Sequence, residues 1–305
     1  MGEPLDWENL RIFAALKRHK SFAAAARPLG VNATTLARRL TALEKQLGVL
    51  LFQRTAEGLV PTEAAATLGE SVLRMEREIE LLQLNVAGRA SRLEGAVRLA
   101  VTEGFAESFL LPRWQPLHER HPGIELHLLL GDAYADLARG EADLAVRFQQ
   151  AGKGAPSQPG SPIEILARRI GRIEVGIFAS RAYLARRGDP RGLDDLEGHD
   201  LVLPRLGAQY LPGAPWFSRV SGRAVIRTDG IGSMTASIVA GLGVGAIATD
   251  VAATHPGLKR IGDEVVDRRD AWLLVPADLA KVGRVRAVWD YILELASARR
   301  GSKKT

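Results

Sequence analysis

The sequence predicts a chain of two parts. The first is an N-terminal, all-α winged helix-turn-helix that continues into a long linker helix, and the second is a C-terminal α/β domain of two lobes. Three observations lead to this fold class. Apolar residues recur at helical spacing between short turns over residues 7–50, and a heptad pattern runs over residues 68–86. From residue 95 onward, strand-like runs alternate with helical segments, which is typical of α/β proteins.

The first 30 residues predict two helices joined to a third by a tight turn. Their inward-facing residues recur at helical spacing: Leu10, Phe13, Ala14 and Leu16, then Phe22, Ala25, Ala26 and Leu29. Ser21 is expected to cap the second helix, and Gly30 to make the turn that follows it. Pro28 has no N–H to donate and fits only where that helix is already ending. This pattern is typical of a helix-turn-helix.

The third helix has an apolar back and a basic, hydroxyl-rich front. Asn32 is expected to cap it, and one buried stripe is formed by Leu36, Leu40, Leu43 and Leu47. The residues that then point away from this stripe are Thr34, Arg38, Thr41 and Lys45. Such a front suits the DNA major groove, where Arg recognises guanine edges and Thr meets a thymine methyl or a phosphate. An ordinary amphipathic surface helix is the alternative interpretation.

A short hairpin is predicted after the third helix. Residues 50–52 have the composition of a strand, and residues 56–58 that of a turn, so together they predict a wing. Arg54 lies at the base of this wing and is a candidate phosphate contact. The full set of candidate DNA contacts is Ser21, Asn32, Thr34, Thr35, Arg38, Arg39, Thr41 and Arg54. Double-stranded DNA is therefore the first candidate partner.

A long helix follows from residue 62, with apolar residues spaced alternately by four and three. These residues are Leu68, Val72, Met75, Ile79, Leu82 and Val86. The spacing is that of a coiled-coil seam, so we expect a homodimer through this helix, although a single long core helix has a similar pattern. Two recognition helices related by a two-fold axis would recognise an inverted-repeat operator.

The remaining sequence predicts two α/β lobes. The expected strands of the first lobe are residues 96–101, 124–130 and 143–147, with a helix ending near Pro122 and another over residues 134–139. Residues 149–162 are rich in Gly, Pro and Ser and predict a surface loop. The second lobe is expected to begin with residues 165–170 and 174–178 and to continue through 201–203 and 224–226. Residues 271–275 and 285–296 then predict a final strand and helix.

Two such lobes predict a ligand cleft beyond the carboxyl ends of their strands. This argument selects the residues Thr102, Gly131, Arg147, Phe148, Pro204 and Thr249. The two threonines would donate hydroxyl hydrogen bonds, and the Arg147 fork would pair with a carboxylate or phosphate. Each also has a structural interpretation, with Thr102 as a helix cap and Arg147 as the partner of Asp143 or another carboxylate. The predicted ligand is a small-molecule effector that could be anionic.

Composition and missing motifs exclude several classes of protein. The chain has 305 residues, 41 Lys and Arg against 35 Asp and Glu, a formal net charge of +6, and no cysteine. The charge suits a polyanion, and the lack of cysteine excludes disulfides and thiolate chemistry. His118 and His121 have no evident third ligand, and Gly241–Gly245 follows a helix rather than a strand, so neither a metal site nor a phosphate loop is predicted. No cofactor and no catalytic residue is predicted. The sequence has no apolar leader or membrane span, so a cytoplasmic protein is expected.

The motifs together resemble the LysR-type transcriptional regulators over the whole chain. The residues that keep this family's spacing are Phe13, Ser21-Phe22, Ala25-Ala26, Leu29-Gly30-Val31, Leu43-Glu44, Leu47-Gly48, Leu51-Phe52-Gln53-Arg54 and Thr62-Glu63. Two positions depart from the pattern. Asn32-Ala33-Thr34 stands where the family often has Ser-Gln-Pro or Ser-Gln-Ser, and Ala37 stands where Ser is usual. Fewer direct hydrogen bonds to bases are therefore expected, with Arg38 and Thr34 most important.

The resemblance implies a transcriptional regulator rather than an enzyme. Its domains would be a winged helix-turn-helix (1–61), a linker and dimerisation helix with a hinge (62–93), and an effector-binding domain (94–305). The last domain would be periplasmic-binding-protein-like, with one lobe made of residues 94–166 and 270–305 and the other of residues 167–269. The family also implies a tetramer built as a dimer of dimers. The alternative is a small-molecule-binding protein or enzyme with an N-terminal protein-interaction domain.

Overall fold

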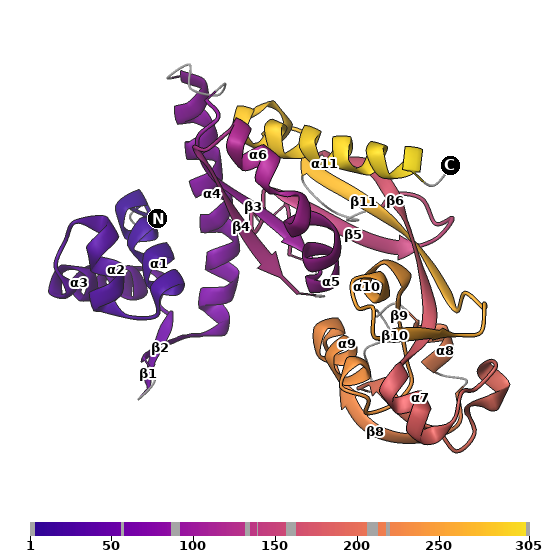
Figure 1. Ribbon diagram of the computed structural model, residues 1–305. Helices are drawn as coiled ribbons and strands as arrows, with labels where there is room; N and C mark the ends of the chain where they lie inside the picture. Colours follow the sequence, from indigo (N-terminus) through magenta and orange to yellow (C-terminus); the bar gives the residue numbers. More distant parts are fainter. Residues whose placement is uncertain are drawn as a thin grey trace. The chain divides into compact units, whose positions relative to one another are not determined.

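The computed structural model of the chain describes residues 4–55, 58–86, 92–131, 135–138, 140–156, 163–205, 213–217 and 220–302 (Figure 1). It divides into two compact units, residues 1–90 and most of residues 91–305. The first is mainly helical and the second is α/β. Among the described helices, none combines the length and the apolar composition that a membrane crossing requires.

The N-terminal unit contains the predicted short helices, hairpin and long helix. Its elements are α1 (Trp7–His19), α2 (Phe22–Leu29), α3 (Ala33–Leu47), β1 (Phe52–Thr55), β2 (Gly58–Pro61) and α4 (Glu63–Val86). The strands β1 and β2 are antiparallel, from Phe52 opposite Pro61 to Thr55 opposite Gly58. The wing strand thus begins two residues later than predicted, and residues 56–57 of its turn lie outside the described residues.

The ends of the short helices follow the predicted signals with one exception. Gly30 adopts a left-handed conformation (φ 64°) directly after α2, in which Pro28 is the last residue but one. The Asn32 side chain accepts a hydrogen bond from the Thr35 amide (2.8 Å) and caps α3. Ser21 occupies the corresponding position of α2 but makes no capping hydrogen bond, so that prediction is wrong. Its backbone is more extended (φ −150°) than that of Asn32 (φ −90°), and its hydroxyl does not reach the first-turn amides.

The first apolar residues of the heptad in α4 pack into the core of the N-terminal unit. Val72 is 1% exposed and belongs to the same buried cluster as the residues of α1 and α3, and Leu68 packs against that cluster. The prediction of a free seam is therefore wrong for Val72. Farther along, Met75 and Leu82 are 42% and 61% exposed. The side chain of Val86 lies outside the described residues.

The C-terminal unit alternates strands and helices along most of its length. Its strands are β3 (Gly95–Val101), β4 (Ile124–Leu130), β5 (Leu144–Gln150), β6 (Ile165–Ser180), β7 (Asp200–Pro204), β8 (Arg223–Thr228), β9 (Gly245–Ala248), β10 (Leu258–Ile261) and β11 (Asp267–Pro276). Its helices are α5 (Glu103–Phe105), α6 (Gln115–Arg120), α7 (Arg181–Arg187), α8 (Ala214–Phe217), α9 (Ile231–Val239), α10 (Thr249–Ala253) and α11 (Gly283–Ser302). A π-helical turn, η1 (Ala106–Leu110), and three 3₁₀ turns, η2 (Leu111–Arg113), η3 (Leu193–Leu196) and η4 (Leu279–Lys281), complete the described elements.

One mixed sheet joins most of these strands. Its order is β10-β6-β11-β5-β3-β4, and β9 also pairs with β6. The pairs of β3 with β4 and β5 are parallel, as the predicted crossovers require, whereas β11 and β6 pair with their neighbours in the antiparallel sense. The helix α11 packs along β3 and β6 (Figure 1). A separate parallel pair, β7 and β8, lies in the second half of the unit.

The strands β6 and β11 are shared by the two predicted lobes. The sequence suggests two segments between residues 165 and 178, but the structure has one continuous strand of 16 residues, β6. The predicted lobe boundaries at 166/167 and 269/270 lie inside β6 and β11, which pair along their length with a register shift between Ala271 and Trp272. We call the first lobe β3, β4, β5, α5, η1 and α6, and the second lobe β7, β8, β9, β10 and α7 to α10.

An ion pair between an exposed arginine and a buried carboxylate connects the crossing strands. The Arg172 guanidinium donates to both oxygens of the Asp270 carboxylate (2.8 and 3.3 Å), and the Gly152 amide donates to one of them (3.3 Å). The hydrogen bond from Arg172 holds the pKa of the Asp270 carboxyl below its usual range, despite burial, and the charge of Arg169 acts in the same direction. The carboxylate is thus expected to be ionised in the folded protein at neutral pH.

The helix predicted over residues 134–139 is absent from the described part of that stretch. Residues 135–136 have no regular structure and residues 137–138 form a turn, while residues 132–134 and 139 lie outside the described residues. The carbonyl of Ala135 accepts a hydrogen bond from the Arg147 side chain.

Candidate functional site

A cavity of about 290 Å³ lies in the C-terminal unit between the two lobes. First-lobe residues that line it include Thr102, Gly104, Phe105, Ser108, Phe109, Arg113, Gly131, Val146, Arg147 and Phe148. The facing residues include Ile231, Met234, Ala246, Ile247, Asp250, Val251 and Thr254. A mainly apolar cavity with a few polar groups is typical of a small-molecule site, and this one is at the small end of the usual range.

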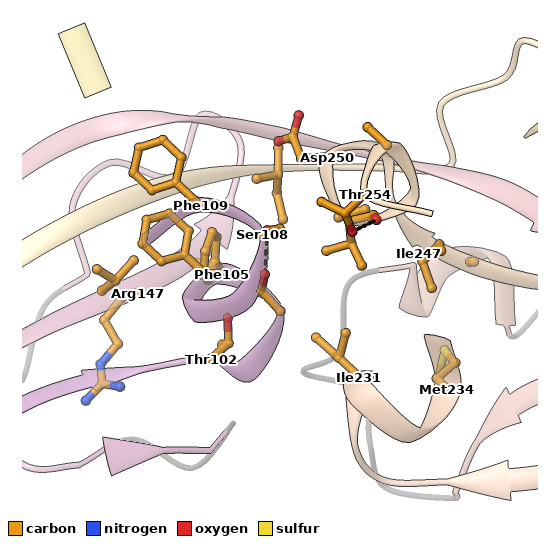
Figure 2. A pocket seen from close by; sticks show the side chains of 18 of the residues that line it. Thr102, Phe105, Ser108, Phe109, Arg147, Ile231, Met234, Ile247, Asp250 and Thr254 are labelled. Atoms are coloured by element: carbon orange, nitrogen blue, oxygen red, sulfur yellow. Dashed lines mark hydrogen bonds between the residues drawn. The ribbon is translucent and has the colours of Figure 1, made fainter. Parts of the chain in front are cut away.

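Three phenylalanine rings form much of the first-lobe wall. The ring centres of Phe105 and Phe109 are 4.8 Å apart, and those of Phe105 and Phe148 are 5.7 Å apart. Phe105 ends α5, and Phe109 lies in the π-helical turn η1, so both follow β3 directly in the chain. Figure 2 shows the rings of Phe105 and Phe109 on one side, with Ile231, Met234 and Ile247 on the other. π-Helical turns are frequent at functional sites.

The lobes approach closely at one edge of the cavity. A Cβ atom on Gly104, in α5, would lie 3.4 Å from methyl groups of both Ile231 and Val251 in the second lobe. The missing side chain at Gly104 therefore leaves room for α9 and α10 against the first lobe. The facing atoms are methyl groups, and their removal from water stabilises the contact between the two walls.

Several polar side chains of the cavity are bonded to backbone carbonyls. The Ser108 hydroxyl donates to Gly104, and the Thr254 hydroxyl donates to Val251 (2.8 Å). Arg113 donates through Nη1 to the carbonyl of Phe109 (3.0 Å), with its guanidinium 5.3 Å from the Phe109 ring centre. The other nitrogens of the exposed Arg113 make no hydrogen bond or ion pair with the residues that the structure describes.

The structure brings four of the six predicted ligand residues to this cavity. Thr102, Gly131, Arg147 and Phe148 line it, whereas Pro204 and Thr249 do not. The Thr249 hydroxyl is buried, without a hydrogen-bond partner among the described residues. The sequence argument missed the phenylalanines of residues 105 and 109 and the apolar residues of α9. Their signal was present, because apolar residues spaced by four directly follow the first strand.

The structure places Arg147 differently from the sequence prediction in two respects. Arg147 and Phe148 lie within β5 rather than beyond its end, and the Arg147 guanidinium donates to the carbonyl of Ala135. Figure 2 shows this side chain extending away from the second-lobe residues. Asp143, its suggested structural partner, instead accepts hydrogen bonds from the backbone amide (2.8 Å) and guanidinium (2.7 Å) of Arg98. Arg98 is far from Asp143 in sequence and lies on the neighbouring parallel strand β3. Nearness in sequence therefore could not identify Arg98 as the partner of Asp143.

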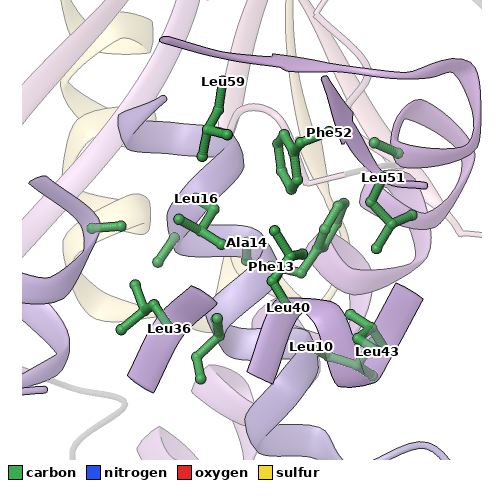
Figure 3. Packing of buried hydrophobic residues seen from close by; sticks show 14 of the residues in the cluster. Leu10, Phe13, Ala14, Leu16, Leu36, Leu40, Leu43, Leu51, Phe52 and Leu59 are labelled. Carbon is green, nitrogen blue, oxygen red and sulfur yellow. The ribbon is translucent and has the colours of Figure 1, made fainter. Parts of the chain in front are cut away.

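A tightly packed core positions the second candidate site, the exposed face of α3. Leu36, Leu40 and Leu43 are buried on its back, against α1 and the hairpin (Figure 3). The Phe13 and Phe52 rings of this core have centres 5.6 Å apart. The Glu44 carboxylate accepts hydrogen bonds from the Leu51 and Phe52 amides (2.7 and 3.3 Å) and ties α3 to β1. The front of α3 is thereby fixed relative to the wing.

That front is exposed as predicted, and most of its hydroxyl groups are engaged. Thr34, Arg38, Thr41 and Lys45 are exposed. The Thr34 hydroxyl donates to the Asn32 side-chain oxygen (2.6 Å), and the Thr41 hydroxyl donates to the Ala37 carbonyl (3.0 Å). Arg38 makes no ion pair or hydrogen bond within the described part of the chain, which leaves its whole guanidinium available to a ligand.

The other predicted contacts surround this face less directly. Arg39 is half-buried, with Nη1 3.8 Å from the Asp6 carboxylate. Thr35 is half-buried and supplies the capped amide of α3. Ser21 is half-buried at the start of α2 and has no capping bond. Arg54 is in β1, and its side chain lies outside the described residues.

No group of three or more His, Asp or Glu side chains among the described residues could hold a metal ion. His118 lies in α6 and His121 follows it, and neither lines the cavity between the lobes. Gly241, with φ 77°, follows α9 and leads into β9, as the sequence argument against a phosphate loop expects.

Comparison with known sequences identifies both units. Residues 7–66 match the family model of the bacterial regulatory helix-turn-helix protein, lysR family, and residues 90–297 match that of the LysR substrate binding domain. The Mau operon transcriptional activator of Paracoccus denitrificans is 28% identical over 303 residues, covering 95% of this chain and 96% of that protein. An HTH-type transcriptional regulator of Xanthomonas campestris is 34% identical over 194 residues. That match covers 64% of this chain and little more than half (54%) of the relative.

Solved structures share the fold over nearly the whole chain. A full-length OxyR variant from Pseudomonas aeruginosa superimposes with a TM-score of 0.69 at 17% identity, covering 96% of this chain and 95% of that one. Full-length CbnR in complex with its target DNA gives a TM-score of 0.58 at 22% identity, covering 92% and 99% of the two chains. The predicted fold class is thus confirmed, and the relatives are regulators rather than enzymes. The chain belongs to the LysR family of helix-turn-helix transcriptional regulators.

Proposed function

We propose that this LysR-type regulator binds an inverted-repeat operator as a dimer, through the exposed face of α3, and that a small molecule in the cavity between the lobes modulates this binding. The observation that carries the proposal is the state of Arg38, which is exposed on the front of α3 and has no partner among the described residues. An unpaired arginine at this place has the geometry to donate two hydrogen bonds to one guanine edge. A chromosomal partner would place the protein in the cytoplasm.

The residues around Arg38 would orient the protein on the DNA backbone. Ser21 begins α2 with an unbonded hydroxyl, and Lys45 adds a charge at the far end of α3. Both are of the types that contact phosphates, as is Arg54 in the wing. The side-chain oxygen of Asn32 already accepts two hydrogen bonds. Its side-chain nitrogen would therefore be the group that contacts DNA. Arg39 contributes mainly charge, since it lies beside Asp6.

Dimerisation would use the part of α4 that its own unit does not cover. Met75 and Leu82 are exposed at heptad spacing, and Ile79 lies half-buried between them. Exposed apolar side chains at this spacing favour pairing with a second α4. The two α3 helices of such a dimer would be related by a two-fold axis and would face successive major grooves. Their two half-sites would then form an inverted repeat. The tetramer that the family implies would need further contacts between C-terminal units.

The effector would act by binding one arrangement of the two lobes more tightly than another. Its apolar part would pack against the rings of Phe105, Phe109 and Phe148 on one side and Ile231 on the other. If the effector is anionic, the geometry favours Arg113 over Arg147 as its partner, because Arg113 keeps unbonded guanidinium nitrogens beside the cavity. The difference in affinity between the two arrangements sets how far the effector shifts their populations.

Selection of duplexes from a random DNA pool by the full-length protein tests the proposed operator. We expect enrichment of an inverted repeat whose affinity falls steeply with salt, since phosphate contacts release counterions. Arg38→Ala should lose the preference for the enriched sequence. Absence of any enriched sequence, with only weak binding that salt abolishes, would contradict the proposal.

Thermal unfolding with a panel of single-ring aromatic acids and their neutral amides tests the cavity. An acid that binds should raise the Tm more than its amide does, and Arg113→Gln should abolish that difference while leaving the amide response unchanged. Equal stabilisation by acid and amide in the natural protein would show that the effector is recognised without its charge.

A further inference from the structure

The front of α3 offers an unusual set of groups to DNA. Thr34, Ala37 and Thr41 follow one another at spacings of three and four residues, so their methyl groups lie in one row along the helix. Arg38 stands beside this row. Thr34 and Thr41 are exposed and Ala37 is half-buried.

Neither threonine has a hydrogen left to donate. A hydroxyl carries one hydrogen, and that of Thr34 is bonded to the Asn32 oxygen (2.6 Å), while that of Thr41 is bonded to the Ala37 carbonyl (3.0 Å). The acceptors of the major groove, which include guanine N7 and O6 and thymine O4, need donors. While these two internal bonds persist, the threonines meet such acceptors with their methyl groups and oxygen lone pairs only.

The remaining polar groups of the helix do not replace them. Asn32 cannot make the two-bond contact with adenine, because its oxygen accepts from both Thr34 and the Thr35 amide. Glu44, which could accept from cytosine, is bonded to the amides of Leu51 and Phe52. Arg38 is thus the main donor of this face, and methyl groups form most of the rest.

These observations point to a particular kind of operator. We infer that each α3 recognises its half-site through one guanine, bound by Arg38, and through thymine 5-methyl groups packed against Thr34 and Thr41. This inference rests on the proposed DNA binding and specifies its sequence. Seven residues separate the two threonines, which is about 10 Å along the helix and roughly three base-pair steps. The two thymines are therefore expected on either side of the guanine.

Replacing thymine by deoxyuridine in the selected operator removes a methyl group and nothing else. Each half-site has two such thymines. For the full-length protein, replacing one of them in a single half-site should lower the affinity about fourfold, and replacing the same thymine in both half-sites should lower it about fifteenfold. Deoxyuridine at other thymines of the same duplex is the control and should change the affinity less than twofold.

Matched variants assign the effect to the two side chains. Thr34→Ser and Thr41→Ser keep the hydroxyl and lose the methyl, so each should weaken binding and become insensitive to deoxyuridine at its own position. Thr34→Val and Thr41→Val keep the methyl and should retain the natural affinity. The Asn32 cap of α3 is preserved in all four variants, since it bonds to the Thr35 amide.

The outcomes separate this inference from the function on which it rests. Specific binding that deoxyuridine leaves unchanged, or that the valine variants lose, would show that the hydroxyl groups recognise the bases and would overturn the inference alone. A random pool that yields no enriched sequence would overturn DNA recognition as a whole, and the inference with it.

Discussion

Gly243 lies in the glycine-rich turn between α9 and β9, and substituting it by alanine should destabilise the second lobe. A Cβ atom at this position would lie 2.8 Å from the carbonyl carbon of Asp200 and closer still to its oxygen. Ordinary contacts of a Cβ atom begin at about 3.4 Å. Because the oxygen is the nearer atom, the backbone of β7 or of the turn must move by roughly 1 Å to admit the methyl group.

That movement acts on two short backbone hydrogen bonds. The Val244 amide donates to the Asp200 carbonyl (2.8 Å), and the Val202 amide donates to the Val244 carbonyl (2.8 Å). A shift of this size along these bonds would stretch both beyond the usual range of hydrogen bonding. Each such bond contributes about 1 kcal/mol, and displacement of the buried strand adds to the cost, so we expect a loss of about 2–4 kcal/mol.

Thermal unfolding of the full-length protein measures this effect. For a unit of this size, the expected loss corresponds to a fall in Tm of roughly 5–15 °C. Gly257→Ala is the matched control, because a Cβ atom there would meet nothing within 4 Å. If Gly243→Ala has the same Tm as this control, the turn tolerates a side chain and the packing argument is wrong.

Three further substitutions test the other sites. Arg38→Ala should weaken operator binding by about 1–3 kcal/mol for each half-site without changing the Tm. The control Arg11→Ala removes the same charge from α1 and should keep the sequence preference. Gel-shift titrations distinguish the two variants. Asp270→Asn should lower the Tm at pH 7. Because the folded pKa of Asp270 is depressed, its contribution is present above the unfolded pKa of about 3.9 and is lost as the pH falls through the folded value, so the difference in Tm should shrink toward pH 3. A constant difference would contradict this assignment. Met75→Lys combined with Ile79→Lys should give monomers in sedimentation velocity, and persistent dimers would place the interface elsewhere.

Local signals in the sequence identified most elements correctly. Asn32 caps α3, and Gly30 and Gly241 end α2 and α9, because such residues act on their own neighbourhood through one hydrogen bond or one backbone angle. The periodicity of Leu36, Leu40 and Leu43 likewise predicted their burial, since helical spacing alone decides which face they share.

The errors arose where a residue's partner is distant in sequence. Val72 fits a heptad equally well whether a second chain or the unit's own core covers it, and only the packing of α4 against α1 decides between them. The partner of Asp143 is Arg98, 45 residues away on a parallel strand. Arg147 was expected beyond the end of its strand, whereas it lies within β5 and donates to the carbonyl of Ala135.

The two sites of this protein use several of their hydroxyl groups in the same way, in hydrogen bonds within the chain. In the cavity, Ser108 and Thr254 are bonded to carbonyls of their own chain, so an effector gains most of its binding energy from the apolar area that it covers. On α3, the engaged threonines would leave base recognition mainly to the unpaired Arg38 and a row of methyl groups. Both surfaces thus satisfy their hydroxyl groups internally and present apolar atoms to the ligand. Shape therefore contributes more to specificity at each site than the number of polar side chains suggests.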